Sequence, residues 1–374
     1  MKLALVTDAW LPQVNGVVTT LERTRQALAQ LGHAVQVFSP DQYVTCPCPT
    51  YPEIRLALWP AHKLAAALDA FEPDAIHVAT EGPLGLSAAA YCRRHSLAFT
   101  TSYHTQFPQY VRRRLPIPEA WSYAFLRRHH RGASRTLVAT PQQCRDLLAQ
   151  GFSNVVIWSR GVDTELFAPC GRDHLAVGRP IFAYAGRVAI DKNLDAFLAL
   201  ELPGTKVVIG DGPDRARLER RYPATRFLGY RFGTDLARCL SAADVFVFPS
   251  RTDTFGVVML EALACGTPVA AYPVTGPIDV ITPGVNGVLA EDLRQAALAA
   301  LALDRATCRE TALTRTWARA TAEFLGHLVD VHDSRDLVTT RPEGPHNPPQ
   351  PCFVPRECGH PFLLPRNGAE RRGH

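Results

Sequence analysis

Residues 244–272 read DVFVFPSRTDTFGVVMLEALACGTPVAAY, which is a strand, a polar loop, a helix and a second strand in direct succession. The first strand, DVFVFP, ends at Pro249, and the helix opens at Val257. The apolar run PVAAY follows this helix. Two buried strands that are separated by a helix predict parallel pairing, in a sheet that helices cover on both faces.

The same alternation continues on both sides of this unit. A polar segment with Gly and Pro at 159–180 divides the chain and predicts an interdomain linker. Each half predicts a doubly wound, Rossmann-like α/β domain, residues 1–165 and residues 166–311, and a helical stretch follows at about 306–329. The expected strands are KLALVT (2–7), AVQVFS (34–39), AIHVAT (75–80), AFTTSY (98–103) and TLVAT (136–140), then IFAYAG (181–186), KVVIG (206–210), TRFLG (225–229), DVFVFP (244–249) and PVAAY (268–272).

Composition narrows the class of protein. The chain has 374 residues, 10 cysteines and a formal net charge of +5. This charge is far below that of a nucleic-acid coat protein, and no nucleic-acid module accompanies the arginines, so we expect no nucleic-acid partner. The N-terminal apolar run stops at Asp8, too early for a signal peptide, and no window has 18 consecutive apolar residues. We therefore expect a cytoplasmic protein with reduced thiols.

The last segment, 333–374, has a different texture. It contains eight of the 30 prolines and no helical or strand period, which predicts disorder. Cys352 and Cys358 lie there with His346 and His360, but Cys-x5-Cys is not a standard zinc spacing. We expect no bound metal.

Two nucleotide motifs are missing from the loops where they would lie. The first strand is followed by a loop with a single glycine, Gly16, and the run Gly210-Asp211-Gly212-Pro213 lacks the third glycine of a dinucleotide fingerprint. There is no Gly-Lys-Ser/Thr sequence either. These observations argue against a nicotinamide enzyme and against a P-loop enzyme.

Four charged residues follow strand ends of the second half instead. Arg187 and Lys192 come after the strand that ends at Gly186, while Asp253 and Glu261 follow DVFVFP. Ligands of doubly wound folds bind at the carboxyl ends of strands. Two cations suit a diphosphate, and two carboxylates suit hydroxyl groups of a sugar and a ribose.

The helix start beside Asp253 adds exposed amides that suit phosphate oxygens, at Phe255, Gly256 and Val257. Simpler explanations stay open at this point. Acidic residues are favoured near helix N-termini by the helix dipole, and the cations could pair with Asp191 or Asp195 in a solvated loop.

Taken together, these stretches resemble the retaining nucleotide-sugar glycosyltransferases of family 4, which have the GT-B fold. The resemblance runs from Lys2 to about Leu328 and is closest to the branch of lipid glycosyltransferases and GDP-mannose-dependent α-mannosyltransferases. It implies two Rossmann-like domains with a cleft between them, and a C-terminal helix, within 312–332, that crosses back onto the first domain.

The resemblance also assigns roles in the donor half. It implies that Arg187 and Lys192 bind the donor diphosphate and that Glu261 binds the ribose. Asp253 stands where the family has the first glutamate of its Glu-x7-Glu motif, and would contact the donor sugar with a side chain one methylene shorter. No Asp-x-Asp motif lies in this half, so we expect neither a metal nor another cofactor.

In the first half, PQVNGVV (12–18) resembles the family's glycine loop, with Asn15-Gly16 where two glycines are frequent. Gly16 would let the backbone approach the diphosphate and the acceptor. His104 matches the family's active-site histidine, although a satisfied loop histidine is the alternative. Glu81 and Asn15 are candidate acceptor contacts, and Arg160-Gly161-Val162-Asp163 corresponds to the hinge motif, with a positioning role.

The acceptor side is marked by charge. Residues 112–131 contain one acidic residue, Glu119, and six arginines, so their charges sum to +5, the formal net charge of the whole chain. The arginines are Arg112, Arg113, Arg114, Arg127, Arg128 and Arg131. Aromatic residues lie between the two clusters, a pattern that suits an anionic membrane surface. A solvated amphipathic helix is the alternative. We expect peripheral contact with the inner face of the plasma membrane and a lipid acceptor such as diacylglycerol, or a glycan.

The sequence therefore predicts a retaining glycosyltransferase that moves a hexose or uronic acid from a nucleoside diphosphate sugar. The resemblance implies that the leaving diphosphate deprotonates the acceptor, so that no protein nucleophile is needed; double displacement stays open. Two alternatives are a nucleotide-sugar epimerase of the same fold and a catalytically silent nucleotide-sugar-binding protein. The sequence decides neither the base, nor the sugar, nor the oligomeric state.

Overall fold

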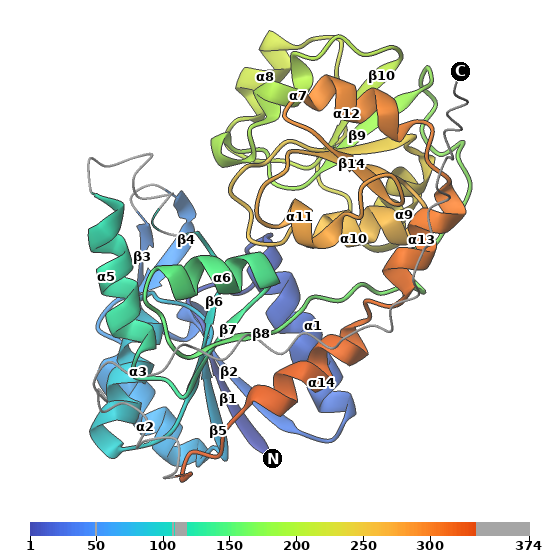
Figure 1. Cartoon of the computed structure of the whole chain (residues 1–374). Helices are drawn as coiled ribbons and strands as arrows, with labels where there is room; N and C mark the ends of the chain where they lie inside the picture. Colours follow the sequence, from blue (N-terminus) through green and yellow to red (C-terminus); the bar gives the residue numbers. More distant parts are fainter. Residues whose placement is uncertain (49–50, 107, 109–117, 334–374) are drawn as a thin grey trace, which may run out of the picture. The chain divides into compact units, whose positions relative to one another are not determined.

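The computed structural model describes residues 1–48, 51–106, 108 and 118–333 (Figure 1). Three of the arginines singled out above, Arg112, Arg113 and Arg114, lie outside these residues. The segment that was expected to be disordered also lies outside them, apart from Asp333.

The first half forms a six-stranded parallel sheet with the strand order β2-β1-β5-β6-β7-β8. The inner strand β1 shows how the sequence specifies two covered faces. Ala4 and Val6 pack into one hydrophobic cluster and Leu3 and Leu5 into another, because neighbouring residues of a strand point to opposite faces. The elements of this half are β1 (Lys2–Val6), α1 (Gly16–Gln30), β2 (Ala34–Phe38), α2 (Ala61–Phe71), β5 (Ala75–Val78), α3 (Pro83–His95), β6 (Thr100–Tyr103), α5 (Glu119–His130), β7 (Arg135–Val138), α6 (Pro141–Ala149) and β8 (Val155–Ile157).

The second half forms another six-stranded parallel sheet, in the order β11-β10-β9-β12-β13-β14. In β9 (Ile181–Ala185), Ala183 lies in one hydrophobic cluster with helices that include α13 (Arg305–Leu313), while Phe182 and Tyr184 lie in another, on the opposite face, with helices that include α12 (Leu293–Ala300). The α/β fold with two Rossmann-like sheets is therefore confirmed. The elements are β9 (Ile181–Ala185), α7 (Leu194–Leu198), β10 (Thr205–Ile209), α8 (Arg215–Arg221), β11 (Arg226–Phe227), α9 (Gly233–Ala242), β12 (Val245–Phe248), α10 (Val257–Ala264), β13 (Val269–Ala271), α11 (Pro277–Val280), β14 (Gly287–Leu289) and α12 (Leu293–Ala300).

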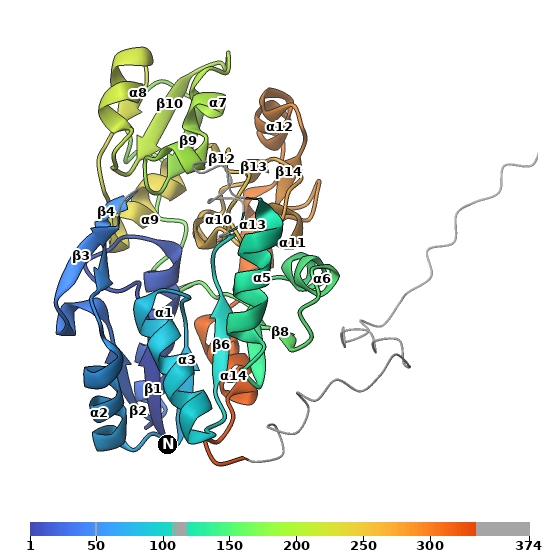
Figure 2. The ribbon, with the colours of Figure 1, turned by 90° about the vertical axis from the view of Figure 1, so that its left-hand side faces the viewer.

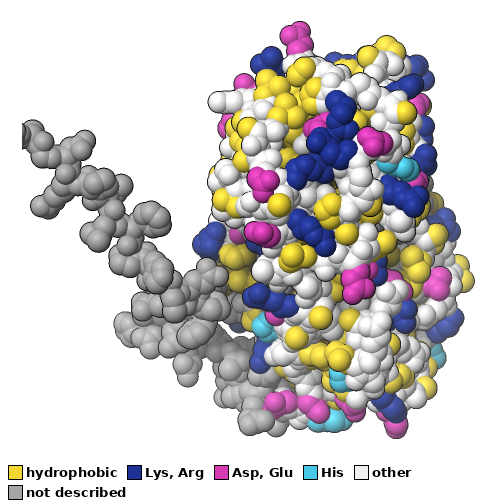
Figure 3. Space-filling model, turned by 90° about the vertical axis from the view of Figure 1, so that its right-hand side faces the viewer, with side chains coloured by type: hydrophobic (Ala, Val, Ile, Leu, Met, Phe, Trp, Pro, Cys, Tyr) yellow, Lys and Arg dark blue, Asp and Glu magenta, His cyan; other side chains and the backbone are white. Residues whose placement is uncertain are grey.

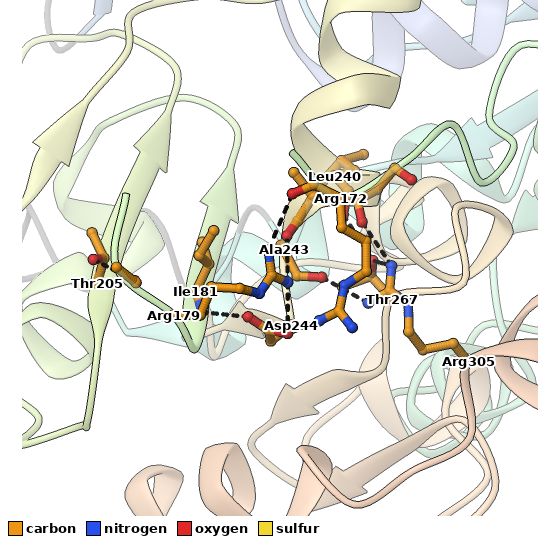
Figure 4. Close-up of polar contacts among 12 residues, drawn as sticks. Arg172, Arg179, Ile181, Thr205, Leu240, Ala243, Asp244, Thr267 and Arg305 are labelled. Carbon is orange, nitrogen blue, oxygen red and sulfur yellow. Dashed lines mark hydrogen bonds and ion pairs between the residues drawn. The ribbon is translucent and has the colours of Figure 1, made fainter. Parts of the chain in front are cut away.

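A charged cluster closes the amino-terminal edge of the second sheet (Figure 4). Asp244 precedes β12, and one of its oxygens accepts from the backbone N–H of Ile181 at 2.6 Å. Its other oxygen pairs with Arg172 and with Arg179, the latter at 2.7 Å. Arg305, the first residue of α13 (Arg305–Leu313), donates to Ala243 O at 2.7 Å. These contacts tie β9 to β12 at the edge opposite the expected ligand site.

The C-terminal stretch forms two helices, α13 (Arg305–Leu313) and α14 (Trp317–His327), where the sequence predicts one. The break lies at 314–316, where Thr316 caps α14 by accepting from Arg319 N and pairs with Val162 in an isolated bridge. Beyond the break α14 packs on the first half: Trp158 Nε1 donates to Ala320 O at 3.1 Å. Phe324 joins the same hydrophobic cluster as Leu3 and Leu5.

A small antiparallel hairpin, β3 (Thr45–Cys48) and β4 (Tyr51–Ala57), lies beside the first sheet where the sequence predicts a loop. Two short 3₁₀ helices complete the described elements, at Pro40–Gln42 and Ile190–Lys192. None of the helices in the described part of the chain is both long and apolar enough to cross a bilayer. Basic and acidic side chains lie interspersed on the face shown in Figure 3.

Candidate functional site

The donor-side residues lie in loops at the carboxyl edge of the second sheet. The loop after β9 carries Arg187 and Lys192, and the loop after β12 carries Asp253. The loop after β10 crosses close to the first of these. A Cβ on Gly210, whose φ is +147°, would lie 1.9 Å from Gly186 O, so this crossing requires glycine. Glycine thus allows the loops of neighbouring strands to meet at one edge.

The two cations and two carboxylates form one charge cluster. Arg187 Nη2 donates to both oxygens of Asp191, at 3.0 and 3.3 Å. Lys192 Nζ pairs with Asp253 and lies 3.8 Å from Asp191. The Arg187, Lys192 and Asp253 side chains are 18–19% exposed, whereas Asp191 is 3% exposed. The structure therefore shows the cations paired with Asp191, as the simpler explanation expected. It also brings Lys192 and Asp253 together, which sequence spacing alone did not establish.

Glu261 lies in the second turn of α10 and is partly buried. Burial raises the pKa of its carboxyl to about 7, and the positive charge of Arg23 opposes that shift. Arg23 belongs to α1 of the first sheet and pairs with Asp163 of the hinge motif at 3.5 Å. Sequence reasoning missed Arg23, because nothing in a helical stretch of the first half marks it as facing the second.

The N-terminus of α10 depends on Gly256, which precedes Val257 with φ +81°. A Cβ at this position would lie 2.8 Å from the ring of Phe248, so the protein itself requires glycine here. Phe255 is buried, at 5% exposure. The predicted amides therefore lie on a fixed turn next to the loop of Asp253.

His104 follows β6 and connects the two halves. Thr254 Oγ1, one residue after Asp253, donates to His104 O at 2.8 Å. His104 as a residue is 8% exposed, and Arg160 Nη2 lies 3.1 Å from its Nδ1. Burial, followed by the charges of Arg160 and His77, holds the pKa of His104 well below its usual range. The ring is thus neutral and lies next to the loop of a predicted donor residue.

The glycine loop shows two different situations. Asn15 caps α1, because its Oδ1 accepts from the N–H groups of Val17 and Val18 at 3.0 Å each. A Cβ on Gly16 would meet no atom within 4 Å. The fold therefore uses Asn15, but it does not itself require glycine at position 16.

Glu81 follows β5, and its Oε1 lies 3.3 Å from His130 Nε2 of α5. Asp8, at the end of β1, lies near it and accepts from the N–H groups of Leu84 and Gly85, so that it caps α3. Burial raises the pKa of Asp8. Glu81 thus has a structural partner in the first half, and its role as an acceptor contact stays a prediction.

The basic residues of α5 lie elsewhere. Arg127, Arg128 and Arg131, in its last turn and just beyond, line a cavity of about 570 Å³ with residues 151–154. This cavity lies where β8 begins, because α5 runs antiparallel to the strands (Figure 2). His104 lies at the opposite edge, where β6 ends. The prediction of one patch beside the acceptor cleft is wrong for these three arginines.

The possible metal ligands of the described residues lie away from the donor loops. In residues 1–48, 51–106, 108 and 118–333, one group of possible ligand atoms lies within 4.8 Å of each other, from His174, Asp235 and Cys239. It belongs to the linker and to α9 and includes none of the donor-side residues. The donor loops offer cations, which suit a diphosphate without a metal ion.

Comparison with known proteins gives a consistent result. The sequence profile for Glycosyltransferase Family 4 matches residues 14–166, and that for Glycosyl transferases group 1 matches residues 179–305. A GDP-mannose-dependent alpha-mannosyltransferase of Mycobacterium tuberculosis is 33% identical over 370 residues, 90% of this chain and 98% of that protein. A GDP-mannose-dependent alpha-(1-6)-phosphatidylinositol dimannoside mannosyltransferase of the same species is 27% identical over 369 residues, 88% of this chain and 96% of that protein.

Solved structures agree on the fold. Anabaena HepE, crystallised in complex with UDP, superposes with a TM-score of 0.64 at 18% identity, over 87% of this chain and 99% of that chain. At this level of identity the similarity shows the GT-B architecture alone.

Proposed function

The chain belongs to glycosyltransferase family 4, and from this premise we propose that it transfers a mannosyl group, with retention, from GDP-mannose to a lipid or glycan acceptor. That it is a nucleotide-sugar glycosyltransferase follows from its family. The choice of mannose rests on the 33% identical relative, whose name states that donor. The main structural support for the donor site is that Lys192 and Asp253, from the ends of two different strands, form an ion pair.

In this proposal Arg187 and Lys192 bind the donor diphosphate, and Glu261 binds the ribose. The ion pairs with Asp191 and Asp253 keep the two cations oriented until phosphate oxygens of the donor replace the carboxylates as their partners. The catalytic work is electrostatic: two fixed cations stabilise the charge that develops on the departing diphosphate. Asp253, freed from Lys192, accepts from hydroxyls of the donor sugar.

Retention follows from attack of the acceptor on the face from which the diphosphate leaves. The leaving group takes the acceptor proton, and the sugar passes through an oxocarbenium-like state. His104 cannot serve as a base in its place, because the cationic form that a base must reach is disfavoured by burial and by Arg160. The reaction is therefore proposed to need neither a protein nucleophile nor a metal.

A donor panel tests this function. GDP-mannose and UDP-sugars are offered with total lipid or with glycan acceptors, in EDTA, and released diphosphate and labelled product are measured. Acceptor-dependent release from GDP-mannose supports transfer. Conversion of the nucleotide sugar without acceptor would indicate an epimerase, binding without turnover a silent protein, and restoration by Mg²⁺ or Mn²⁺ alone a metal-dependent enzyme.

Peripheral membrane contact, on the cytoplasmic face, is proposed on the surface of α5. Trp121 and Phe125 are 74% and 43% exposed, one turn apart, and Arg128 and Arg131 continue the same exposed face. Aromatic side chains suit the lipid interface, and each basic residue near an anionic surface adds about 1 kcal/mol.

Co-sedimentation with vesicles tests this contact. Vesicles with anionic lipid should bind the protein, and Arg128→Gln/Arg131→Gln should weaken that binding by about tenfold or more. The matched control, Arg94→Gln/Arg145→Gln, removes two exposed charges from other helices of the same sheet. Equal binding by both double variants, or binding that ignores anionic lipid, would contradict the proposal.

A further inference from the structure

Arg160 is a buried cation with an unusual set of partners. It is 3% exposed, and within the described residues no carboxylate lies at ion-pair distance from it. Its Nη1 donates to Trp158 O at 2.6 Å and to Ser159 O at 3.1 Å, and its guanidinium lies over the Trp158 ring, 4.4 Å from the centroid. Burying a charge is costly, so an arginine kept here without an ion pair calls for a specific task.

The remaining contact of Arg160 defines that task. Its Nη2 lies 3.1 Å from His104 Nδ1. A guanidinium has only N–H donors, so Nδ1 must be the acceptor and carries no proton. A neutral imidazole then has its proton on Nε2. Nε2 of His104 is buried and has no hydrogen-bond partner in the described part of the chain.

We propose that Arg160 is a positioning residue that locks His104 in the Nε2–H tautomer and so presents one unpaired N–H donor to the reacting groups. This inference rests on the proposed function, since His104 lies beside the loop of Asp253 through its contact with Thr254. The ligand group that receives this N–H is an oxygen acceptor, a hydroxyl of the donor sugar or an oxygen of its phosphate.

The segment that carries Arg160 is held by the C-terminal helix. Glu323 of α14 accepts from Ser159 N at 2.9 Å and also from the Ser159 hydroxyl. Trp158 is fixed by its bond to Ala320 O. Helix α14 is therefore linked to the imidazole of His104 through residues 158–160, so it contributes indirectly to the position of that ring.

The ionisable groups that bear on His104, directly or through Arg160, lie on three different elements. Arg160 lies in the segment after β8, His77 lies on β5, and Glu323 lies on α14, from where its charge acts on Arg160. His77 is itself fully buried, with Nδ1 near Thr100 Oγ1 and Nε2 near Ser102 Oγ, and burial lowers its pKa to about 3. Removing the Arg160 charge should therefore raise the pKa of His104, with burial still opposing protonation.

Two variants of Arg160 and a matched control test the proposal. Arg160→Met removes the donor and the charge, Arg160→Lys restores both in part, and Arg135→Gln removes another arginine that bonds α14, at Gly326 O, away from His104. Histidine ring ¹⁵N shifts report the tautomer, and kcat, KM and melting temperature are measured in parallel.

We expect the His104 ring of the full-length protein to show the Nε2–H pattern, and Arg160→Met to lose it. We also expect kcat of Arg160→Met to fall about 10- to 100-fold, as for the loss of a charged hydrogen bond, and to acquire a new decline on the acid side of its pH profile. Arg160→Lys should recover part of the loss, and Arg135→Gln should match the unmodified protein.

A Nδ1–H ring in the unmodified protein would overturn the proposal, as would Arg160→Met with unchanged tautomer and kcat. If Arg160→Met does not fold, the ring ¹⁵N spectrum of the unmodified protein and the Arg160→Lys variant test the proposal instead. Arg160→Lys with a Nδ1–H ring but unchanged kcat and an unchanged acid side of the pH profile would overturn it. The tautomer is read without substrate, so its outcome is separate from failure of the transfer assay.

Discussion

Replacing Lys192 by Gln perturbs the donor site most selectively. Lys192 Nζ pairs with Asp253, and both side chains are below 20% exposure, at 19% and 18%. The variant keeps length and polarity but removes one of the two cations proposed to face the diphosphate. Loss of one preorganised group that stabilises developing charge costs about 3–4 kcal/mol, a decrease of 10²–10³ in kcat.

The same change should affect stability little. A partly exposed ion pair contributes about 0–1 kcal/mol, so the melting temperature should shift by no more than about 4 °C. Steady-state kinetics with GDP-mannose, with folding checked by calorimetry, separates the two effects.

Lys206→Gln is the matched control. Lys206 is the second residue of β10 and lies at the opposite edge of the same sheet, where its Nζ donates to Leu200 O at 2.6 Å. This variant should lose stability and retain kcat. The electrostatic role of Lys192 would be refuted if Lys192→Gln kept more than about a tenth of the kcat of the unmodified enzyme. It would also be refuted if Lys206→Gln lost as much kcat as Lys192→Gln.

Three further outcomes are expected. Because burial raises the pKa of Glu261 to about 7, above the 4.5 of a free carboxyl, its ionisation destabilises the fold as pH rises, so Glu261→Gln should be more stable above pH 7, by up to about 3 kcal/mol. We expect the KM for donor of the unmodified enzyme to rise below pH 7, where this carboxyl becomes protonated, and the KM of Glu261→Gln to lack that rise. Gly16→Ala should leave the melting temperature unchanged and raise KM, whereas Gly256→Ala should cost about 1–3 kcal/mol of stability, and equal melting of the two would contradict the difference in space around them. Asp244→Asn should lower the free energy of unfolding by about 1 kcal/mol in denaturant titration, because the partly exposed Arg172 and Arg179 lose an ion-pair partner, while kcat per folded molecule stays the same.

Local patterns predicted most of the fold. The apolar runs at 181–186 and 244–249 became β9 and β12, because alternate residues of both strands could be buried on two faces. The helix break at 314–316 was not predictable from helical spacing, since it arises where the chain pairs with Val162 of another segment. The hairpin at 45–57 was missed because its cysteine- and proline-bearing sequence resembles a loop.

For the site, residue types after strand ends predicted Arg187, Lys192 and Asp253, because all parallel strands of a sheet end at the same edge. The residues that contact these site residues could not be predicted from the sequence. Arg160 and Glu323 lie 163 positions apart in the sequence and act together only through the position of α14. Which edge of the sheet each end of α5 approaches could be told only from the direction of α5 relative to β8, which is why the three arginines of α5 were assigned to the acceptor side.

Retaining transfer of mannose from GDP-mannose is the reaction that we propose for this chain. Its most direct measurement is the anomeric configuration, by NMR, of the product formed from GDP-α-mannose and the acceptor found in the donor panel, with EDTA present. We expect an α-mannoside, formed by the unmodified enzyme and about 10²–10³ times more slowly by Lys192→Gln. A β-mannoside would contradict the stereochemistry, and the absence of any mannosylated product would contradict the proposed function.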